Sequence, residues 1–376
     1  MSNSTCVRTV PFFDYPGLFA SERGEYVAIF NSVCERGAFI KQQDLAEFEQ
    51  NLATFLGARY VLGVGNATDG LHFALRSVGI RSGDEVIFSS HTMLATAAAI
   101  HFAGATPVPV ECAPDHLIAA DAVEAAITSR TRAIMPTQLN GRTADMAALQ
   151  RLADRHGLLI VEDAAQALGS RFRGRLSGTF GAASAISFYP AKVLGCFGDG
   201  GAIVTNDREV FECLVSLCDF GRNGAGEVVR WGLNSRLDNL QAAFLDFKLK
   251  KYDGVMCRRR FIASLYTDRL KDVAEIVLPP APDSDPDHFD IYQNYEIESE
   301  CRDELKAYLK EHGIGTLIQW GGQAVHQAKA LGLTQNLPYT DWLFTRMLML
   351  PINMSLSVED IDHVCSTIRA FYGYAQ

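Results

Sequence analysis

A single lysine stands at the end of a short apolar segment in the middle of the chain. Residues 185–189 predict a buried strand, Pro190 ends it, and Lys192 follows at once. A lysine in such a place can be ion-paired at the rim of a sheet. Desolvation can also lower its pKa, so that the neutral amine attacks a carbonyl and forms a Schiff base. The surrounding residues must decide between these interpretations.

Two neighbouring features favour the Schiff-base interpretation. Glycines at positions 195, 198, 200 and 201 let the backbone pass close to a bound group. Upstream, residues 158–163 predict another buried strand, which ends in Asp163. On neighbouring parallel strands, Lys192 and Asp163 would face the crevice at the carboxyl ends of the sheet. Pyridoxal phosphate needs such a pair, because an amine holds its aldehyde and an acid its ring nitrogen.

A glycine-rich turn nearer the amino terminus is a candidate anion site. Residues 59–64 predict a strand, and residues 65–70 lead into a helix. The N–H groups of Ala67 and Thr68 would lie at the helix amino end, where the dipole favours an anion. An ordinary turn capped by Thr68 explains the same residues. A dinucleotide-binding turn is a weaker rival, because Thr68 stands where its third glycine is expected.

Composition narrows the class of protein. The chain has 376 residues, 48% of them hydrophobic, which favours two domains with substantial cores. Its net charge is −10, and we interpret the one dense basic run, residues 258–260, as the solvated face of a helix. We therefore expect no nucleic-acid partner.

Cysteine usage and apolar runs indicate the compartment. The nine cysteines include no C-x-x-C pair, so we expect no metal site and a reducing environment. Residues 1–8 lack the apolar core of a signal peptide, and no apolar run reaches membrane-spanning length. These features predict a cytoplasmic protein that does not bind membranes.

The elements that must position these residues alternate along the chain. Strand-like and helical segments follow one another from residue 59 to residue 205, which predicts an α/β fold with a mostly parallel sheet covered on both faces by helices. A helical run over residues 237–270, capped by Ser235, is long enough to connect two domains. We expect a large domain over residues 1–250.

The remainder predicts a smaller α+β domain over residues 251–376. A proline- and aspartate-rich linker at 279–286 precedes a strand at 291–298, in which Tyr292 and Tyr295 are expected to point into the core.

As a set, these motifs resemble those of the nucleotide-sugar aminotransferases of the DegT type, a branch of the aspartate-aminotransferase-like pyridoxal phosphate enzymes. The likeness runs from Pro11 to the last helix. Its most specific segments are residues 65–70, 162–166, 187–192, 198–201 and 234–237.

The resemblance implies a set of cofactor-binding residues. They are Ala67, Thr68, Met93, Asp163, Gln166, Ser187, Lys192 and Asn234. Lys192 and Asp163 would be catalytic, as the Schiff-base lysine and the partner of the ring nitrogen. Gln166 would contact the phenolic oxygen of the cofactor. Asn234 would reach the phosphate of the other subunit's cofactor, which implies a homodimer with shared active sites.

The phosphate contacts and the departures from the family pattern complete the implied site. Ala67, Thr68 and Ser187 would hold the phosphate. Met93 stands where an aromatic residue usually stacks on the cofactor ring, and a thioether gives a softer contact.

Substrate contacts are less well defined. Gln138 stands where the family often has histidine, and Asn140 and Leu168 also depart from the pattern. Candidate substrate residues are Arg236, His326 and Gln138. Local ion pairing of Arg236 and local hydrogen bonding of His326 are the competing interpretations.

The resemblance implies transfer of an amino group from L-glutamate to a keto group of a nucleotide-linked (dTDP, GDP or UDP) 3- or 4-keto-6-deoxyhexose. The product would be an amino sugar for polysaccharide, including lipopolysaccharide, or glycoside biosynthesis. Two alternatives remain open: a cyclic keto-polyol such as an inosose as acceptor, and a non-catalytic regulator that binds pyridoxal phosphate.

Overall fold

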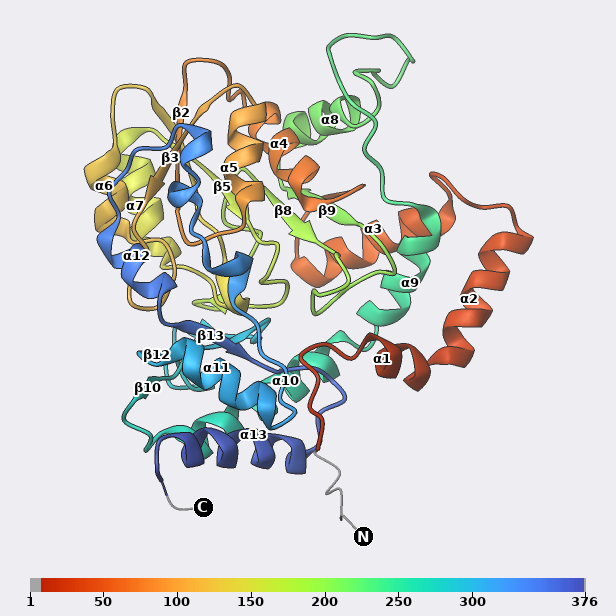
Figure 1. Cartoon of the computed structure of the whole chain (residues 1–376). Helices are drawn as coiled ribbons and strands as arrows, with labels where there is room; N and C mark the ends of the chain where they lie inside the picture. Colours follow the sequence, from red (N-terminus) through yellow and green to blue (C-terminus); the bar gives the residue numbers. More distant parts are fainter. Residues whose placement is uncertain (1–7, 375–376) are drawn as a thin grey trace.

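The computed structural model describes residues 8–374, which form a large unit and a smaller one (Figure 1). Residues 1–7 and 375–376 lie outside the described part, and with them Cys6 and nearly all of the segment compared with a signal peptide. Within residues 8–374 we find no helix whose length and apolar character would let it cross a membrane.

A seven-stranded sheet forms the centre of the large unit. Its strands are β1 (Tyr60–Val64), β2 (Glu85–Ser89), β3 (Thr106–Val110), β4 (Thr131–Met135), β5 (Leu159–Asp163), β8 (Ala183–Ser187) and β9 (Gly201–Thr205). Their order in space is β1-β9-β8-β5-β4-β2-β3. β9 pairs antiparallel with both neighbours, whereas the pairs from β8 to β3 are parallel. The predicted mostly parallel α/β sheet is confirmed.

Helices cover both faces of this sheet, because successive strand residues are apolar on both sides. On β2, Val86 and Phe88 pack into one core and Ile87 into another. The first face is covered by α4 (Ala67–Ser77), α5 (Leu94–Phe102) and α8 (Arg208–Leu217). The second is covered by α3 (Gln43–Leu56), α6 (Ala120–Ala126), α7 (Met146–His156) and α9 (Asn239–Leu249).

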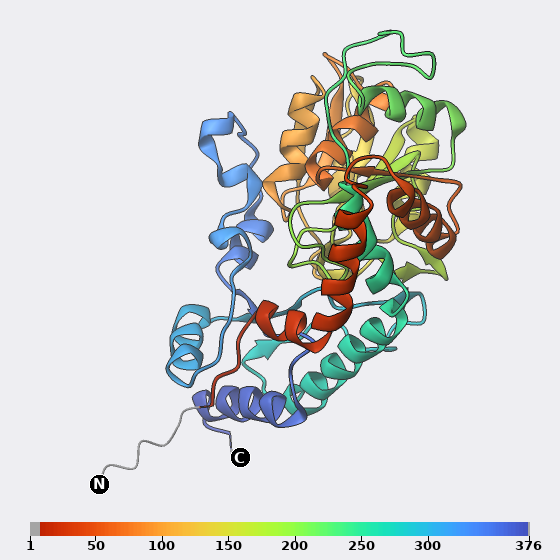
Figure 2. The same ribbon diagram turned by 90° about the vertical axis from the view of Figure 1, so that its right-hand side faces the viewer.

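The smaller unit has its own antiparallel sheet and core (Figure 2). Its main elements are α10 (Tyr252–Leu270), β10 (Ile276–Val277), β12 (Tyr295–Ser299), α11 (Arg302–Glu311), β13 (Met347–Leu350) and α13 (Val358–Phe371). Tyr292 and Tyr295 are both buried in this core, as predicted. Val10 packs there too, so the first described residues join the carboxyl-terminal part of the chain.

Shorter elements complete the structure. They are α1 (Tyr15–Ser21), α2 (Arg23–Glu35), β6 (Arg171–Phe172), β7 (Arg175–Leu176), β11 (His288–Phe289), α12 (Pro338–Phe344) and the 3-10 helices η1 (Leu139–Gly141), η2 (Gln319–Gly322), η3 (Val325–Gln327) and η4 (Lys329–Leu331).

The single helix predicted over residues 237–270 is wrong. α9 ends at Leu249 and α10 begins at Tyr252, with a break between them. The buried Tyr252 hydroxyl donates to the carbonyl of Leu168 at 2.7 Å, which fixes the start of α10 against the large unit. Ser235 does not cap a helix either, because α9 starts after Asp238.

The arginine run at 258–260 is not a solvated face. Arg259 is buried, and its guanidinium donates to the carbonyls of Tyr292 and Gln293 at 2.8 Å each. Arg260 donates to the carbonyl of Asp290 at 2.8 Å. These carbonyls belong to an irregular segment before β12 that needs donors from elsewhere. A basic run in the sequence cannot reveal backbone acceptors that lie some thirty residues away.

Candidate functional site

Lys192 lies in the loop that follows β8, as its position after an apolar segment predicted. The peptide groups on both sides of it are held by one side chain of the smaller unit. Gln293 accepts from the N–H of Val193 at 2.9 Å and donates to the carbonyl of Ala191 at 2.8 Å. Burial lowers the pKa of Lys192 to about 8, and the charge of Asp163 opposes this shift. Its amine is therefore far closer to neutrality than an exposed lysine.

Asp163 ends β5, the strand that pairs in parallel with β8. Its side chain is buried and bonded on both oxygens. Thr96 donates to Oδ2 at 2.7 Å, and the N–H of Ala165 donates to Oδ1 at 3.2 Å. Burial raises the pKa of Asp163, whereas these hydrogen bonds and the charge of Lys192 oppose the rise. Within residues 8–374 no cationic side chain bonds to this carboxylate.

The turn between β1 and α4 presents backbone donors. Asn66 caps the helix by accepting from the N–H of Asp69 at 2.8 Å, so the helix begins one residue before Thr68. Among the described residues, the N–H groups of Ala67 and Thr68 have no acceptor. At the amino end of an 11-residue helix they suit an anion. Gly201 allows this arrangement, because a Cβ there would lie 2.7 Å from the nitrogen of Ala67.

Ser235 supports this turn from a distant segment. Its hydroxyl accepts from the N–H of Gly65 at 3.0 Å and donates to Asp69 at 2.6 Å. The residue predicted to cap a helix thus ties residues near 235 to the anion-binding turn.

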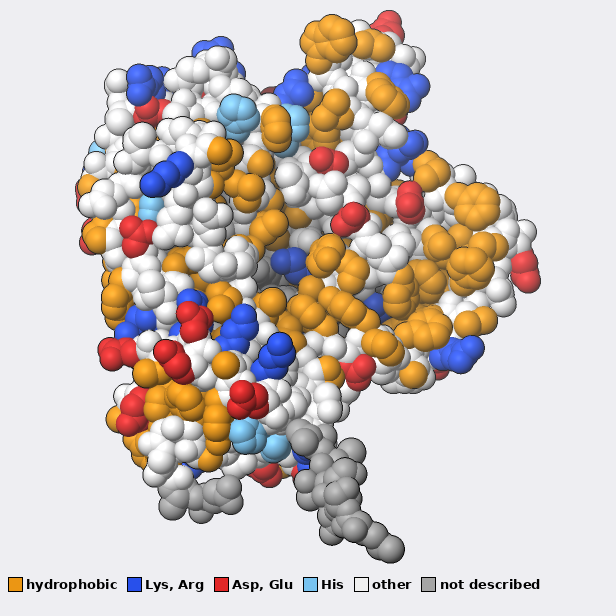
Figure 3. All heavy atoms as spheres, in the orientation of Figure 1, with side chains coloured by type: hydrophobic (Ala, Val, Ile, Leu, Met, Phe, Trp, Pro, Cys, Tyr) orange, Lys and Arg blue, Asp and Glu red, His pale blue; other side chains and the backbone are white. Residues whose placement is uncertain are grey.

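These groups converge on one cavity of about 510 Å³ between the two units. Figure 3 shows a hollow near the middle of the molecule, with a basic side chain inside it. The cavity is lined by seven of the residues predicted for the cofactor, Ala67, Thr68, Met93, Asp163, Gln166, Ser187 and Lys192. Met93 is 51% exposed at the start of α5, so its thioether is free to contact a bound group.

Four other predicted residues, all within the described part, lie outside the lining of this cavity. Gln138 is fully buried; it donates to Glu162 at 2.8 Å and accepts from the N–H of Ala144 at 2.7 Å. Asn234 is exposed, and Arg236 is half-buried.

His326 is the fourth of these residues, and it is buried and bonded at both ring nitrogens. Its Nδ1 lies 2.7 Å from the hydroxyl of Ser90 and its Nε2 lies 3.0 Å from Asp341. The local environment thus accounts for both polar atoms of this ring.

The smaller unit contributes to the cavity amide side chains that the sequence did not single out. They are Gln293, Asn294 and Gln319, with Trp320 beside them. The one feature of the sequence that could have indicated these residues is the Asn140–Gly141 pair, which is typical of a turn. Asn140 has φ +55, and a Cβ on Gly141 would lie 2.5 Å from the nitrogen of Gln293. This turn brings the two segments together.

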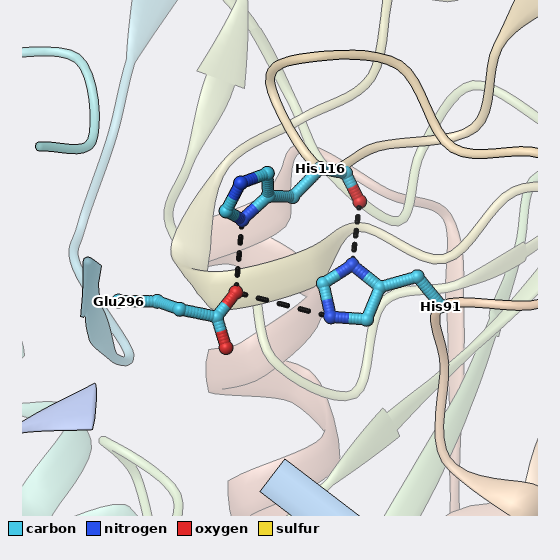
Figure 4. Close-up of side chains that lie close together, drawn as sticks. All are labelled: His91, His116 and Glu296. Atoms are coloured by element: carbon cyan, nitrogen blue, oxygen red, sulfur yellow. Dashed lines mark hydrogen bonds and ion pairs between the residues drawn. The ribbon is translucent and has the colours of Figure 1, made fainter. Parts of the chain in front are cut away.

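A buried charge cluster lies behind these amides (Figure 4). His91, His116 and Glu296 place three possible metal-ligating atoms within 4.8 Å of one another. His116, however, bonds a carboxylate through each nitrogen, Glu296 at 2.9 Å and Glu298 at 3.1 Å. Although burial alone would lower it, these contacts raise the pKa of His116 to about 9. His116 is therefore a protonated imidazolium that lies between the carboxylates of Glu296 and Glu298.

Comparisons with known proteins agree over nearly the whole chain. A sequence model of the DegT/DnrJ/EryC1/StrS aminotransferase family matches residues 21–369. The chain is 40% identical over 375 residues to the dTDP-3-amino-3,4,6-trideoxy-alpha-D-glucose transaminase of Streptomyces venezuelae, covering 98% of each. It is 37% identical to the dTDP-3-amino-3,6-dideoxy-alpha-D-galactopyranose transaminase of Aneurinibacillus thermoaerophilus, covering 97% of this chain and 100% of that one. The crystal structure of S. venezuelae DesV superimposes with a TM-score of 0.93 at 40% identity, covering 98% of this chain and 100% of DesV.

Proposed function

Because the chain belongs to the DegT/DnrJ/EryC1/StrS aminotransferase family, we propose that it transfers an amino group from L-glutamate to a keto group of a nucleotide-linked 3- or 4-keto-6-deoxyhexose. Membership and the similarity to sugar transaminases make it a pyridoxal-phosphate-dependent transaminase. The observation that carries the proposal is one cavity lined by Lys192, Asp163 and the free N–H groups of α4.

The chain's own residues fit the cofactor. Asp163 is a buried carboxylate to which no cationic side chain of residues 8–374 bonds, and a protonated ring nitrogen would supply that cation. The unpaired N–H groups of Ala67 and Thr68 suit its phosphate, and Ser187 lines the cavity with them. When bound, pyridoxal phosphate supplies an aldehyde that carries the amino group and a cationic ring that accepts electrons.

Lys192 has two tasks in this scheme. Its amine, with a pKa lowered to about 8, is nucleophilic enough at neutral pH to hold the cofactor. When it is not linked to the cofactor, the same amine would serve as the base that accepts the proton from the donor's Cα. Gln293 fixes the backbone on either side of Lys192 and so limits where the amine can go.

The proposal is tested with purified holoenzyme in the direction of deamination. The dTDP-linked amino sugars after which the two relatives are named are supplied with 2-oxoglutarate, and L-glutamate is measured. We expect glutamate formation that the Lys192→Ala variant abolishes. Failure with every dTDP-, GDP- and UDP-linked amino sugar, together with turnover of an amino-inositol, would replace this function by the keto-polyol alternative.

We further propose a homodimer whose active sites are shared. Apolar side chains gather on the surface over α1 and α2 (Figure 3). Large ones are exposed on α2, in the loop before α3 and in the loop before α9: Phe30 at 49%, Phe39 at 52% and Trp231 at 90%. Mixing inactive Lys192→Ala and Asn234→Ala variants tests the sharing. Random pairing should restore about a quarter of the sites, because each mixed dimer keeps one intact pair. No recovery in demonstrated mixed dimers would place Asn234 outside the partner's site.

A further inference from the structure

Asn140, Asn294 and Gln319 form a hydrogen-bonded chain of amides at one wall of the cavity, which we call the substrate side. Asn140 is at its centre, where its Oδ1 accepts from Asn294 at 2.8 Å and from Gln319 at 2.7 Å. Its Nδ2 donates to Oε1 of Glu296 at 3.0 Å. Gln319 also donates to Oε2 of Glu296 at 2.7 Å. One buried carboxylate therefore receives donors from two members of the chain.

A carboxylate only accepts hydrogen bonds, and this fixes which way each amide points. Glu296 requires the NH₂ groups of Asn140 and Gln319 to face it. The carbonyl of Asn140 must then face outward, so it takes the NH₂ group of Asn294. The hydrogen bonds therefore determine the orientations of these amide groups.

Two amide oxygens of this chain are left over. The carbonyl oxygens of Asn294 and Gln319 receive no hydrogen bond from the described residues. Neither oxygen belongs to the fully buried polar atoms that lack a partner. Both residues line the cavity. The wall therefore presents two acceptors, which suit hydroxyl hydrogens and oppose groups that can only accept.

The cluster in Figure 4 keeps Glu296 ionised although it is 2% exposed. Burial alone would raise the pKa of Glu296, but the hydrogen bond from His116 and the histidine charges lower it to about 2. Glu298 faces His116 from the other side, and Arg346 lies 3.4 Å from Glu298. His91 is also buried against the cluster, and burial lowers its pKa to about 4.

We propose that Glu296 is a positioning residue that holds the amides of Asn294 and Gln319 as acceptors for hydroxyl groups of the sugar substrate. The inference rests on the proposed function, because it names the part of the substrate that this wall recognises. Glu296 does not line the cavity of about 510 Å³ and acts only through the amides.

Glu296→Gln tests this orientation with little change in shape. Glutamine has one acceptor where the carboxylate has two, so Asn140 or Gln319 must turn its amide around. In either case a carbonyl that faces the cavity is replaced by an NH₂ group. Glu298→Gln is the matched control, because Glu298 bonds His116 but none of the amides.

Binding and kinetics are measured on the holoenzymes. Calorimetry uses the pyridoxamine phosphate form with dTDP-3-amino-3,6-dideoxygalactose, which cannot turn over in that form. For Glu296→Gln we expect Kd and KM to rise about tenfold with kcat changed less, as the loss of one or two hydrogen bonds implies. Glu298→Gln should change them less than threefold.

The cofactor spectrum should stay close to that of the wild type in both variants. Gln166 accepts from the backbone N–H of Asn140 at 2.9 Å, which no amide reversal removes, and from Nδ2 of Asn294 at 3.3 Å, which a reversal of Asn294 would remove. The shorter of the two bonds remains in either variant. A purely structural role for Glu296 would instead disturb the spectrum and KM together.

Moving the carboxylate from position 296 to position 140 should restore binding. In Glu296→Gln combined with Asn140→Asp, the new aspartate accepts from Asn294 and Gln319, so their carbonyls face the cavity again. Recovery of Kd to within threefold of wild type supports the proposal. Equal losses in the two single variants, or no recovery in the double variant, would overturn it.

A crystal structure of Glu296→Gln separates this inference from the proposed function. If the wild-type protein binds none of the nucleotide sugars, the proposed substrate is wrong. Amide deuteron positions in a neutron structure of the same crystals decide the inference: unchanged amide orientations of Asn294 and Gln319 would refute the role of Glu296, and a reversed orientation of either one would support it.

Discussion

The two sides of the cavity are built in different ways. The cofactor side comes from strand ends and one helix start within residues 65–201, and its key groups, Lys192 and Asp163, come from neighbouring strands. The substrate side joins residues near 140, 294 and 319 through side-chain hydrogen bonds and two backbone bonds, from Ile291 to Gly141 at 2.9 Å and from Asn294 to Asn140 at 3.4 Å. The first side is fixed by backbone topology, so each of its residues acts where its strand ends. The second depends on partners far apart in the sequence, so it is open to change without loss of the fold.

Breaking the cofactor side should have the largest effect. We expect Lys192→Ala to lower kcat by about 10,000-fold or more, because both the covalent link and the proton transfer are lost. The holoenzyme should also lose its visible absorbance. Lys248→Ala is the control: this lysine is half-buried, its pKa is also lowered by burial, and it donates a hydrogen bond to the carbonyl of Gly195 at 2.6 Å. Normal absorbance in Lys192→Ala would refute the assignment.

Asp163→Asn should lower kcat by about 1,000-fold. Asparagine keeps the shape and still accepts from Thr96, but it removes the charge that favours a protonated ring nitrogen. Thermal unfolding of both proteins checks that the fold survives. A variant with wild-type kcat would mean that Asp163 is not the partner of the ring.

Removing His116 should affect stability and leave the cofactor side intact. The folded chain holds this proton up to a pH of about 9, whereas an unfolded histidine releases it near 6.5. Its stabilisation is therefore complete below pH 6.5 and is lost as the pH rises through about 9. Across this range the free energy of unfolding should fall by on the order of 3 kcal/mol.

His116→Gln should show a flatter curve with an unchanged cofactor spectrum. Denaturant titrations at pH 6, 7.5 and 9 measure the difference. Identical slopes in the two proteins would show that the imidazolium does not stabilise the fold.

The smallest effect is a pH dependence of cofactor capture by the apoprotein. With a pKa of about 8, the neutral fraction of Lys192 rises from about a tenth at pH 7 to about nine tenths at pH 9. The rate of appearance of the visible band should rise about tenfold and then level off. A rate still climbing steeply at pH 10 would mean that burial does not lower the pKa of this lysine.

The sequence predicted the cofactor side of the cavity better than the substrate side, because the two sides are built differently. The sheet, the two strand-end groups and the turn at 65–70 were visible because apolar runs, glycines and polar residues lie next to one another in the chain. Ser235 and Arg259 were misassigned, because their partners are Asp69 and the carbonyls of Tyr292 and Gln293. The amides behind the substrate side were missed for that reason too: no local pattern records which distant group an amide will meet.

The hydrogen bonds of Gln293 to the two peptide groups beside Lys192 connect the loop that carries the reactive amine to the smaller unit. Gln293 is itself held by Arg259, whose guanidinium binds its carbonyl from α10. Through these contacts the smaller unit is connected to the backbone on both sides of Lys192, so a displacement of this unit would also shift the loop that carries the amine.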